Sequence, residues 1–155
     1  MPVNCFVDTN LLVYTRDSSE PLKQQQALEW MAHLWSSRTG RLSFQVLQEF
    51  YITVTEKLRP GMNIKAARQD VRMFMVWKPI PVDIGVVERA WSIQDRYRIS
   101  WWDALIVSAA QMADCQYLLT EDLQNGQKFG RLQTVNPFLT HPESLKNYLP
   151  PEGLP

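Results

Sequence analysis

The sequence contains Val3-Asn4-Cys5-Phe6-Val7-Asp8, a short apolar run that ends on an acid. A second run, Tyr117-Leu118-Leu119-Thr120-Glu121-Asp122, has the same character. Apolar runs of this length predict short buried strands. Helical spacing of apolar residues between the two runs predicts helices over 21–36, 45–58, 63–77, 84–97 and 101–113. Short apolar strands that alternate with helices predict an α/β fold, a central parallel β-sheet flanked by helices on both faces.

Shorter elements are expected between and after these. Residues 11–14 are expected to form one or two helical turns, Leu42–Phe44 and 132–135 short strands, and 79–82 an extended segment. Five prolines follow Asn136, so the end of the chain is expected to be irregular and peripheral.

The composition excludes several classes of protein. The 155 residues are 45% hydrophobic, 11% aromatic and 21% charged, unlike a disordered chain, a collagen or a disulfide scaffold. No run approaches the roughly 18 apolar residues of a membrane span, and Asp8 interrupts the first apolar run, which also lacks a basic flank. We therefore expect a cytoplasmic protein with no membrane segment, in which Cys5 and Cys115 are buried free thiols.

Charge is unevenly distributed along a chain whose formal net charge is zero. Residues 57–98 hold nine basic and four acidic side chains, a net charge of +5, whereas 1–56 and 99–155 are acidic. Solvated helix faces would explain this pattern. A surface that binds phosphates beside a centre that holds cations would also explain it, although solvated faces are preferred on the charge pattern alone.

Four acids occupy positions that could converge. Asp8 and Asp122 follow predicted strands, and carboxyl ends of parallel strands are where such sheets bind ligands. Asp103 falls in the first turn of helix 101–113, and Glu49 borders the apolar stripe of helix 45–58. Each acid also has an ordinary structural interpretation: a cap at Asp8, a capping box of Ser100 with Asp103, a solvated charge at Glu49 and a polar turn at Glu121-Asp122. Those interpretations do not explain why all four lie at one end of one sheet.

Convergence would favour a bound cation. Two carboxylates ~4 Å apart repel by about 4 kcal/mol at an effective dielectric near 20. Oxygen ligands suit Mg²⁺ or Mn²⁺ better than zinc, and neither His33 nor His141 has metal-ligand spacing. Carboxylates that hold one or two such ions can support phosphodiester hydrolysis.

Four segments together resemble the PIN-domain ribonucleases, and most closely the VapC toxins of bacterial toxin–antitoxin pairs. They are Val7-Asp8-Thr9-Asn10, Gln48-Glu49-Phe50, Trp102-Asp103-Ala104-Leu105-Ile106 and Leu119-Thr120-Glu121-Asp122. The resemblance covers about residues 3–138. It implies a three-layer PIN-like nuclease domain over 1–138, followed by a Pro-rich C-terminal tail over 139–155.

The resemblance also implies roles and partners. Asp8, Glu49, Asp103 and Asp122 would be the catalytic residues and the metal ligands for Mg²⁺ or Mn²⁺, with Asn10 and Thr120 as site support. The substrate would be single-stranded RNA, the partner a small antitoxin protein, and the assembly a homodimer.

Alternatives remain at this point. A PIN-like scaffold that binds RNA or protein without cutting is possible, although such scaffolds usually lose acids that this chain keeps. A phosphoacceptor receiver domain is disfavoured, because Lys128 lies far into a Gly-containing loop. Arg68, Arg72 and Lys78 are candidates to bind RNA phosphates. Packing is the preferred role for Trp101-Trp102, with base stacking as the alternative.

Overall fold

The computed structural model describes residues 3–148 and contains a five-stranded sheet in the order β2-β1-β3-β5-β4. All neighbouring strands are parallel except the β4–β5 pair. The strands are β1 (Cys5–Val7), β2 (Gly40–Arg41), β3 (Tyr117–Leu119), β4 (Lys128–Phe129) and β5 (Leu132–Val135). Among the helices of residues 3–148, none combines the length and apolarity needed to cross a bilayer.

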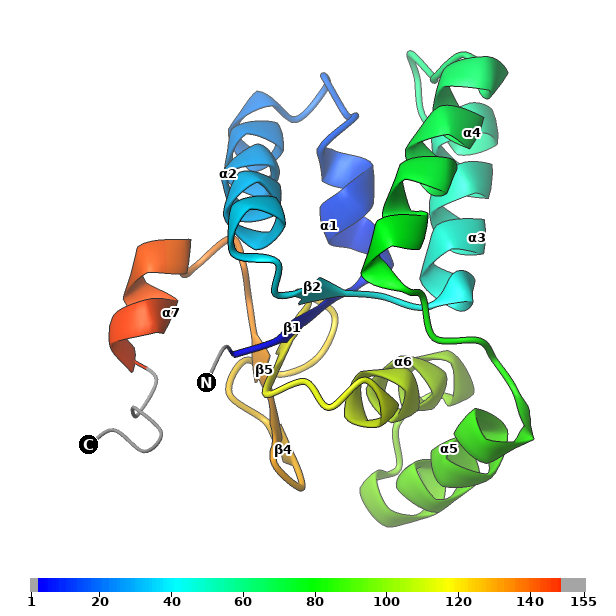
Figure 1. The fold of residues 1–155 in the computed structure, drawn as a ribbon, viewed down its shortest axis with the longest axis vertical. Helices are drawn as coiled ribbons and strands as arrows, with labels where there is room; N and C mark the ends of the chain where they lie inside the picture. The colour runs from blue at the N-terminus through cyan, green and yellow to red at the C-terminus, as the bar shows by residue number, and fades with distance from the viewer. Residues whose placement is uncertain (1–2, 149–155) are drawn as a thin grey trace.

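Helices lie on both sides of this sheet and make three layers (Figure 1). One side carries α1 (Thr9–Tyr14), α2 (Pro21–Ser37), α3 (Phe44–Ile52) and α4 (Ile64–Met73). The other side carries α5 (Ile84–Tyr97) and α6 (Trp101–Met112). A π-helical turn, η1 (Thr53–Lys57), follows α3, a 3₁₀ turn, η2 (Phe74–Trp77), follows α4, and α7 (Pro142–Tyr148) packs beside α2. The predicted three-layer α/β architecture is confirmed.

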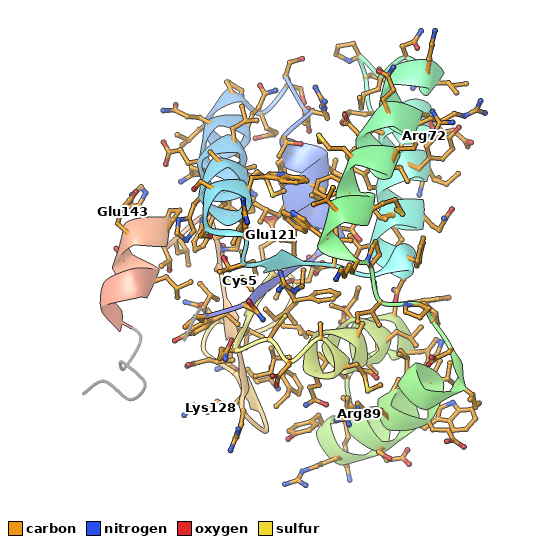
Figure 2. The ribbon with its side chains drawn as sticks, viewed as in Figure 1. Cys5, Arg72, Arg89, Glu121, Lys128 and Glu143 are labelled. Carbon is orange, nitrogen blue, oxygen red and sulfur yellow. The ribbon has the colours of Figure 1, made fainter. Side chains whose placement is uncertain are left out.

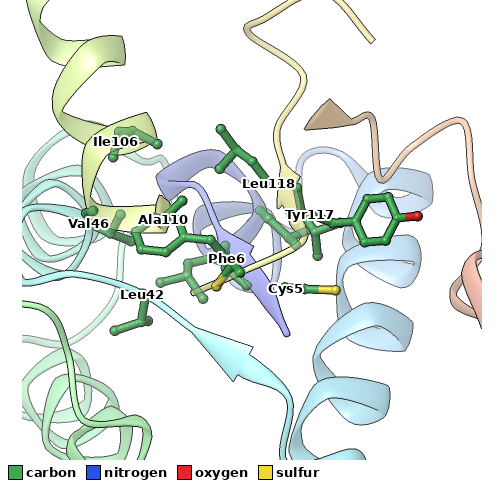
Figure 3. Packing of buried hydrophobic residues seen from close by; sticks show 14 of the residues in the cluster. Cys5, Phe6, Leu42, Val46, Ile106, Ala110, Tyr117 and Leu118 are labelled. Atoms are coloured by element: carbon green, nitrogen blue, oxygen red, sulfur yellow. The ribbon is translucent and has the colours of Figure 1, made fainter. Parts of the chain in front are cut away.

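The two apolar runs that predicted strands pair at the centre of the sheet. Cys5 lies opposite Tyr117 and Phe6 opposite Leu118, and all four are buried. Because side chains alternate along a strand, these pairs face opposite layers. Figure 3 shows Phe6 and Leu118 directed toward α6 and the start of α3, and Cys5 and Tyr117 directed toward α2.

This pairing places the ends of β1 and β3 together. The Asp8 N–H donates to the Leu119 carbonyl at 3.1 Å, so Asp8 and the turn after Thr120 begin at the same edge of the sheet. Helix α6 packs beneath that edge, and its residues Ala104 to Ala110 are all buried. Apolar residues cover nearly the whole circumference of α6, which is typical of a helix buried on more than one side.

Several expected boundaries differ from the structure. The strand expected over Leu42–Phe44 lies at Gly40–Arg41, because the Ser43 hydroxyl caps α3 and Phe44 already begins that helix. The helices expected to run to 58 and 77 end at Ile52 and Met73 and continue as the turns η1 and η2. Strand β4 was not expected, since it is only two residues long.

The end of the chain is more regular than its prolines suggested. Irregular structure was expected from Asn136 on, but residues 142–148 form α7, with Pro142 at a first-turn position that tolerates proline. The preceding segment is held against α2, because the Trp30 indole N–H donates to the Pro137 carbonyl at 2.8 Å. The part of the expected tail at 149–155 lies outside the described residues.

Both cysteines are buried free thiols, as expected. Burial raises the pKa of the Cys5 thiol to about 12, so this group stays neutral and packs as a small apolar side chain.

Candidate active site

Four acids from four separate elements line one pocket of about 520 Å³, called here the acidic pocket (Asp8, Glu49, Asp103 and Asp122). Asp8 directly follows β1, and Asp122 lies in the turn after β3. Glu49 lies on α3, and Asp103 lies in the first turn of α6. The structure thus brings the four sequence-predicted acids together, and their catalytic role stays a prediction.

Asp8 is the most buried of these acids, with 8% of its surface exposed. Its carboxylate accepts hydrogen bonds of 2.7 Å from the Thr9 N–H and from the Thr120 hydroxyl. Burial raises the pKa of Asp8 to about 6, the charges of Asp122 and Glu49 add to the rise, and the two hydrogen bonds oppose it. Asp8 is also the N-cap of α1, so the capping role and the place in the pocket coexist.

Asp122 is held by the two residues expected to support the site. The Asn10 side-chain amide donates to both Asp122 carboxylate oxygens at 3.1 Å. The Asp122 N–H donates to the Thr120 hydroxyl at 3.0 Å, and that hydroxyl in turn donates to Asp8. Burial and the nearby charge of Asp103 raise the pKa of Asp122. Thr120 therefore couples the positions of two acids.

Glu49 and Asp103 are oriented differently. The Thr9 hydroxyl donates to the Glu49 carboxylate at 2.6 Å, and so Thr9 touches two acids of the pocket. At Asp103 only half of the expected capping box forms, with the Asp103 N–H donating to the Ser100 hydroxyl at 3.1 Å. Within residues 3–148 no hydrogen bond or ion pair reaches the Asp103 carboxylate, which leaves it available to a ligand.

Glu121 is adjacent to Asp122 but is bound elsewhere. Its carboxylate pairs with the Lys23 ammonium at 3.1 Å and accepts a hydrogen bond from the Tyr14 hydroxyl at 3.4 Å. Lys23 also lies over the rings of Tyr14 and Phe138. The choice between the two adjacent acids, which the sequence alone settled only by motif, thus agrees with the geometry.

Comparison with known proteins agrees with this arrangement. The PIN domain family model matches residues 5–128, which is most of the chain. The chain belongs to the PIN domain family. No curated protein matches it significantly.

Solved structures with the same fold include two proteins named for toxin systems. One comes from a toxin–antitoxin complex of Klebsiella pneumoniae, with 18% identity, a TM-score of 0.55, and 86% of this chain and 98% of that chain covered. Another is VapC20 of Mycobacterium tuberculosis, a toxin that cleaves the sarcin–ricin loop, with 19% identity, a TM-score of 0.54, and 77% and 90% covered. At these identities the likeness establishes the PIN-domain fold. The domain boundary expected at residue 138 stays a prediction.

The oxygen donors of this PIN domain suit a hard divalent cation bound in an open site. Among residues 3–148, no three acidic, histidine or cysteine side chains stand close enough together to hold a single ion. Mg²⁺ usually takes only one or two carboxylates and keeps several waters. The oxygen donors fit such an ion, as do the raised pKa values of Asp8 and Asp122, which come first from burial and then from neighbouring negative charges.

One face of α3 and η1 forms a wall of the acidic pocket, of which sequence reasoning had singled out Glu49 and, within the basic segment 57–98, Lys57. The residues of this wall are Gln45, Gln48, Glu49, Ile52, Thr53 and Lys57. Their spacing of three or four residues is that of a helix face, which was the available signal. Lys57 supplies the one cation that lines this pocket.

The two adjacent tryptophans have different surroundings. Trp101 is partly buried and packs against the core, as expected. Trp102 is 63% exposed and lines the acidic pocket, so the packing role preferred for it is wrong. The first turn of α6 points Trp102 and Asp103 to the pocket side, while the buried stretch starts only at Ala104.

The three basic residues expected to bind RNA do not form one group. Arg68 and Arg72 are exposed on α4, with the Arg68 guanidinium donating to the Tyr51 hydroxyl at 3.1 Å. Figure 2 shows Arg72 on the outside of α4. Lys78 lines a different pocket, which shares no residue with the acidic pocket.

Proposed function

We propose that this PIN domain is a metal-dependent endoribonuclease that hydrolyses phosphodiester bonds of single-stranded RNA. The observation that carries the proposal is the convergence of four carboxyl groups, from four elements, on one open pocket. Three polar side chains, Thr9, Asn10 and Thr120, hold three of those groups, those of Glu49, Asp122 and Asp8 in turn. A pocket built only to stabilise the fold would pair its acids with cations, as Glu121 is paired with Lys23.

Each residue of the pocket has a specific task in this proposal. Asp8, Glu49, Asp103 and Asp122 would together provide the ligands for Mg²⁺ or Mn²⁺, with one or two carboxylates to an ion and water as the remaining ligands. Such an ion supplies an activated water and neutralises charge that develops on the phosphate. Thr120 and Thr9 fix the direction of the Asp8 carboxylate, and Asn10 fixes that of Asp122. Lys57, at the wall of the pocket, would bind an RNA phosphate, and exposed Arg68 and Arg72 would extend that contact.

We further propose that the protein is the toxin of a toxin–antitoxin pair. One solved structure of the same fold comes from a toxin–antitoxin complex, which supports a small antitoxin protein as the partner. The other is a toxin that cleaves an RNA loop, which supports RNA as the substrate. The cytoplasm suits an RNA substrate and free thiols. The homodimer stays a prediction, which light scattering of the purified protein would check.

Cleavage of a labelled single-stranded RNA tests the nuclease. We expect cutting with Mn²⁺ or Mg²⁺, none with EDTA, and none from Asp103→Asn. This substitution should leave the fold intact, because the Asp103 carboxylate makes no hydrogen bond within residues 3–148. Asp95→Asn, an exposed acid on α5, is the matched control and should cut normally. Cutting that survives Asp103→Asn or EDTA would rule out the carboxylate mechanism. A protein that binds RNA but never cuts it would instead be the non-catalytic scaffold.

A further inference from the structure

A second pocket, of about 580 Å³, lies toward the amino ends of the strands, whereas the acidic pocket lies at their carboxyl ends. It is called here the basic pocket (Trp35, Arg38, Arg41, Trp77 and Lys78). The end of α2, the start of the sheet at β2 and the segment after η2 form its walls. Gly40 pairs with Cys5, the first residue of β1, which places this pocket toward the amino ends of the strands.

The charge of the basic pocket has one sign. Arg38, Arg41 and Lys78 line it, and no acidic side chain does. Within residues 3–148 none of the three forms an ion pair. The Arg41 guanidinium donates to the Gly40 carbonyl at 2.7 Å, which holds it at the pocket wall. Three unpaired cations around one hollow favour an anionic ligand.

Two of these cations occupy backbone positions that favour glycine. Arg38 ends α2 with φ of 59°, and Lys78 ends η2 with φ of 52°, both in the left-handed region. Glycine is the usual residue at such positions because it has no Cβ. The chain therefore has long basic side chains at two positions where glycine would adopt the backbone conformation with less strain.

Aromatic rings complete the basic pocket. Trp77 packs so closely on Gly40 that a Cβ there would meet its ring, and the centroids of Trp35 and Trp77 are 5.0 Å apart. Val76 beside them is 72% exposed. Trp77 itself is buried, so the partly buried Trp35 is the ring of this wall that a base can reach. Cations beside such a ring suit a ligand with both phosphates and flat bases.

We propose that the basic pocket is a second RNA-binding site, which takes a phosphate and base of the strand outside the cleavage point. The inference rests on the proposed function, because RNA is the anion brought to this molecule. An RNA bound at both pockets would be held more tightly than the acidic pocket alone allows, since the second contact becomes intramolecular. An acidic protein segment is the competing occupant, and the test separates the two.

The test measures RNA binding in Asp103→Asn protein with EDTA, by fluorescence anisotropy of a labelled single-stranded RNA at several salt concentrations. The double variant Arg38→Gly with Lys78→Gly should lower the slope of log affinity against log salt by about 1.4, since each phosphate contact on a single strand contributes about 0.7. Its melting temperature should not fall, because glycine suits both backbone positions. Arg98→Gly is the matched control, as Arg98 is exposed, has φ of 56° and lies outside both pockets, and it should leave the slope unchanged.

An unchanged slope in the double variant would overturn the inference. Equal affinity, per negative charge, for inorganic polyphosphate or an oligoglutamate peptide would also overturn it, since a general anion site needs no base. The proposed function fails separately, if the unsubstituted protein neither binds nor cuts RNA. Protein that cuts RNA normally while the double variant changes nothing disproves only the second site.

Discussion

At the scale of single residues, Asp8 is both buried and a candidate metal ligand. Burial disfavours the ionised carboxylate that a metal ligand needs, unless a cation is bound. Asp8 is almost fully buried, and burial raises its pKa from the ordinary 3.8 to about 6. The folded state therefore holds the proton more tightly than the unfolded chain, so this carboxyl stabilises the fold most below pH 3.8 and loses that contribution as pH rises through 6. Two pKa units correspond to about 3 kcal/mol.

Asp8→Asn should therefore stabilise the metal-free protein at neutral pH, by about 1–3 kcal/mol, because the ionised buried carboxylate is removed. Urea denaturation in EDTA would measure this, and the difference from the unsubstituted protein should grow between pH 4 and pH 7. Asp95→Asn, exposed on α5, should show no such growth. A difference independent of pH would contradict the assigned cause.

For Trp102 the role preferred from the sequence, packing, is wrong. The sequence pattern predicts only that Trp102 lies on an apolar helix. The structure is needed to show which face of α6 carries it: its side chain is 63% exposed and lines the acidic pocket. Asp8 and Asp122, by contrast, were predictable because parallel strands align their carboxyl ends. The role of Thr9 was not predicted, since its hydrogen bond to Glu49 joins segments forty residues apart.

Trp102→Ala should weaken RNA binding by about 1–3 kcal/mol, the usual contribution of one stacked base, and leave the melting temperature nearly unchanged. Anisotropy of labelled RNA measures the affinity. Trp91→Ala is the matched control, because Trp91 is 50% exposed on α5 and outside both pockets. Equal losses from both substitutions would mean that Trp102 has no specific contact with a base.

At the scale of elements, the longest ones were the most predictable. Helices α2, α5 and α6 were expected within a residue of their observed ends, because their caps and breakers are explicit in the sequence. The turns η1 and η2 were missed, since apolar spacing continues through them and cannot distinguish an α-helix from a π-helical or 3₁₀ turn. Strand β2 was misplaced because two residues carry no periodicity.

The contact between Gly40 in β2 and Trp77 in η2 leads to a prediction at the scale of elements. Gly40→Ala should destabilise the protein by about 1–3 kcal/mol, because a Cβ at Gly40 would lie 2.3 Å from the Trp77 ring, and the ring cannot move without disturbing Trp35. Chemical denaturation measures the loss. Gly85→Ala is the control, as its Cβ would meet nothing nearer than 3.4 Å, and it should be neutral or stabilising. A harmless Gly40→Ala would show that Trp77 is not tightly packed.

At the scale of the whole molecule, the fold separates charges that are mixed along the chain. The basic segment 57–98 divides between the acidic pocket, through Lys57, and the basic pocket, through Lys78. Composition could predict an excess of basic charge in this segment but not its division, which depends on how α4 and η2 cross the sheet. Arg38 and Arg41 lie in the acidic first third of the chain, and only the fold joins them to Lys78.

Cation binding in the acidic pocket should also change the stability of the whole molecule. Burial, and to a smaller extent the charges of neighbouring carboxylates, raise the pKa of Asp8 and Asp122, and a divalent cation would favour the ionised forms of both groups. A ligand that binds only the folded state stabilises it by about 2.7 kcal/mol at a hundred times its Kd. Saturating Mn²⁺ should therefore raise the melting temperature by roughly 5–10 °C.

Scanning calorimetry with Mn²⁺, and with a matched ionic strength of NaCl, would measure this shift. The increase should disappear in Asp8→Asn with Asp122→Asn, whose metal-free form should already be more stable because the buried negative charge and the smaller repulsion beside it are gone. It should persist in Glu88→Gln, an exposed acid on α5 outside the pocket. An equal Mn²⁺ effect on all three proteins would show that the cation binds elsewhere, and the four carboxyl groups would then lose their assignment as its ligands.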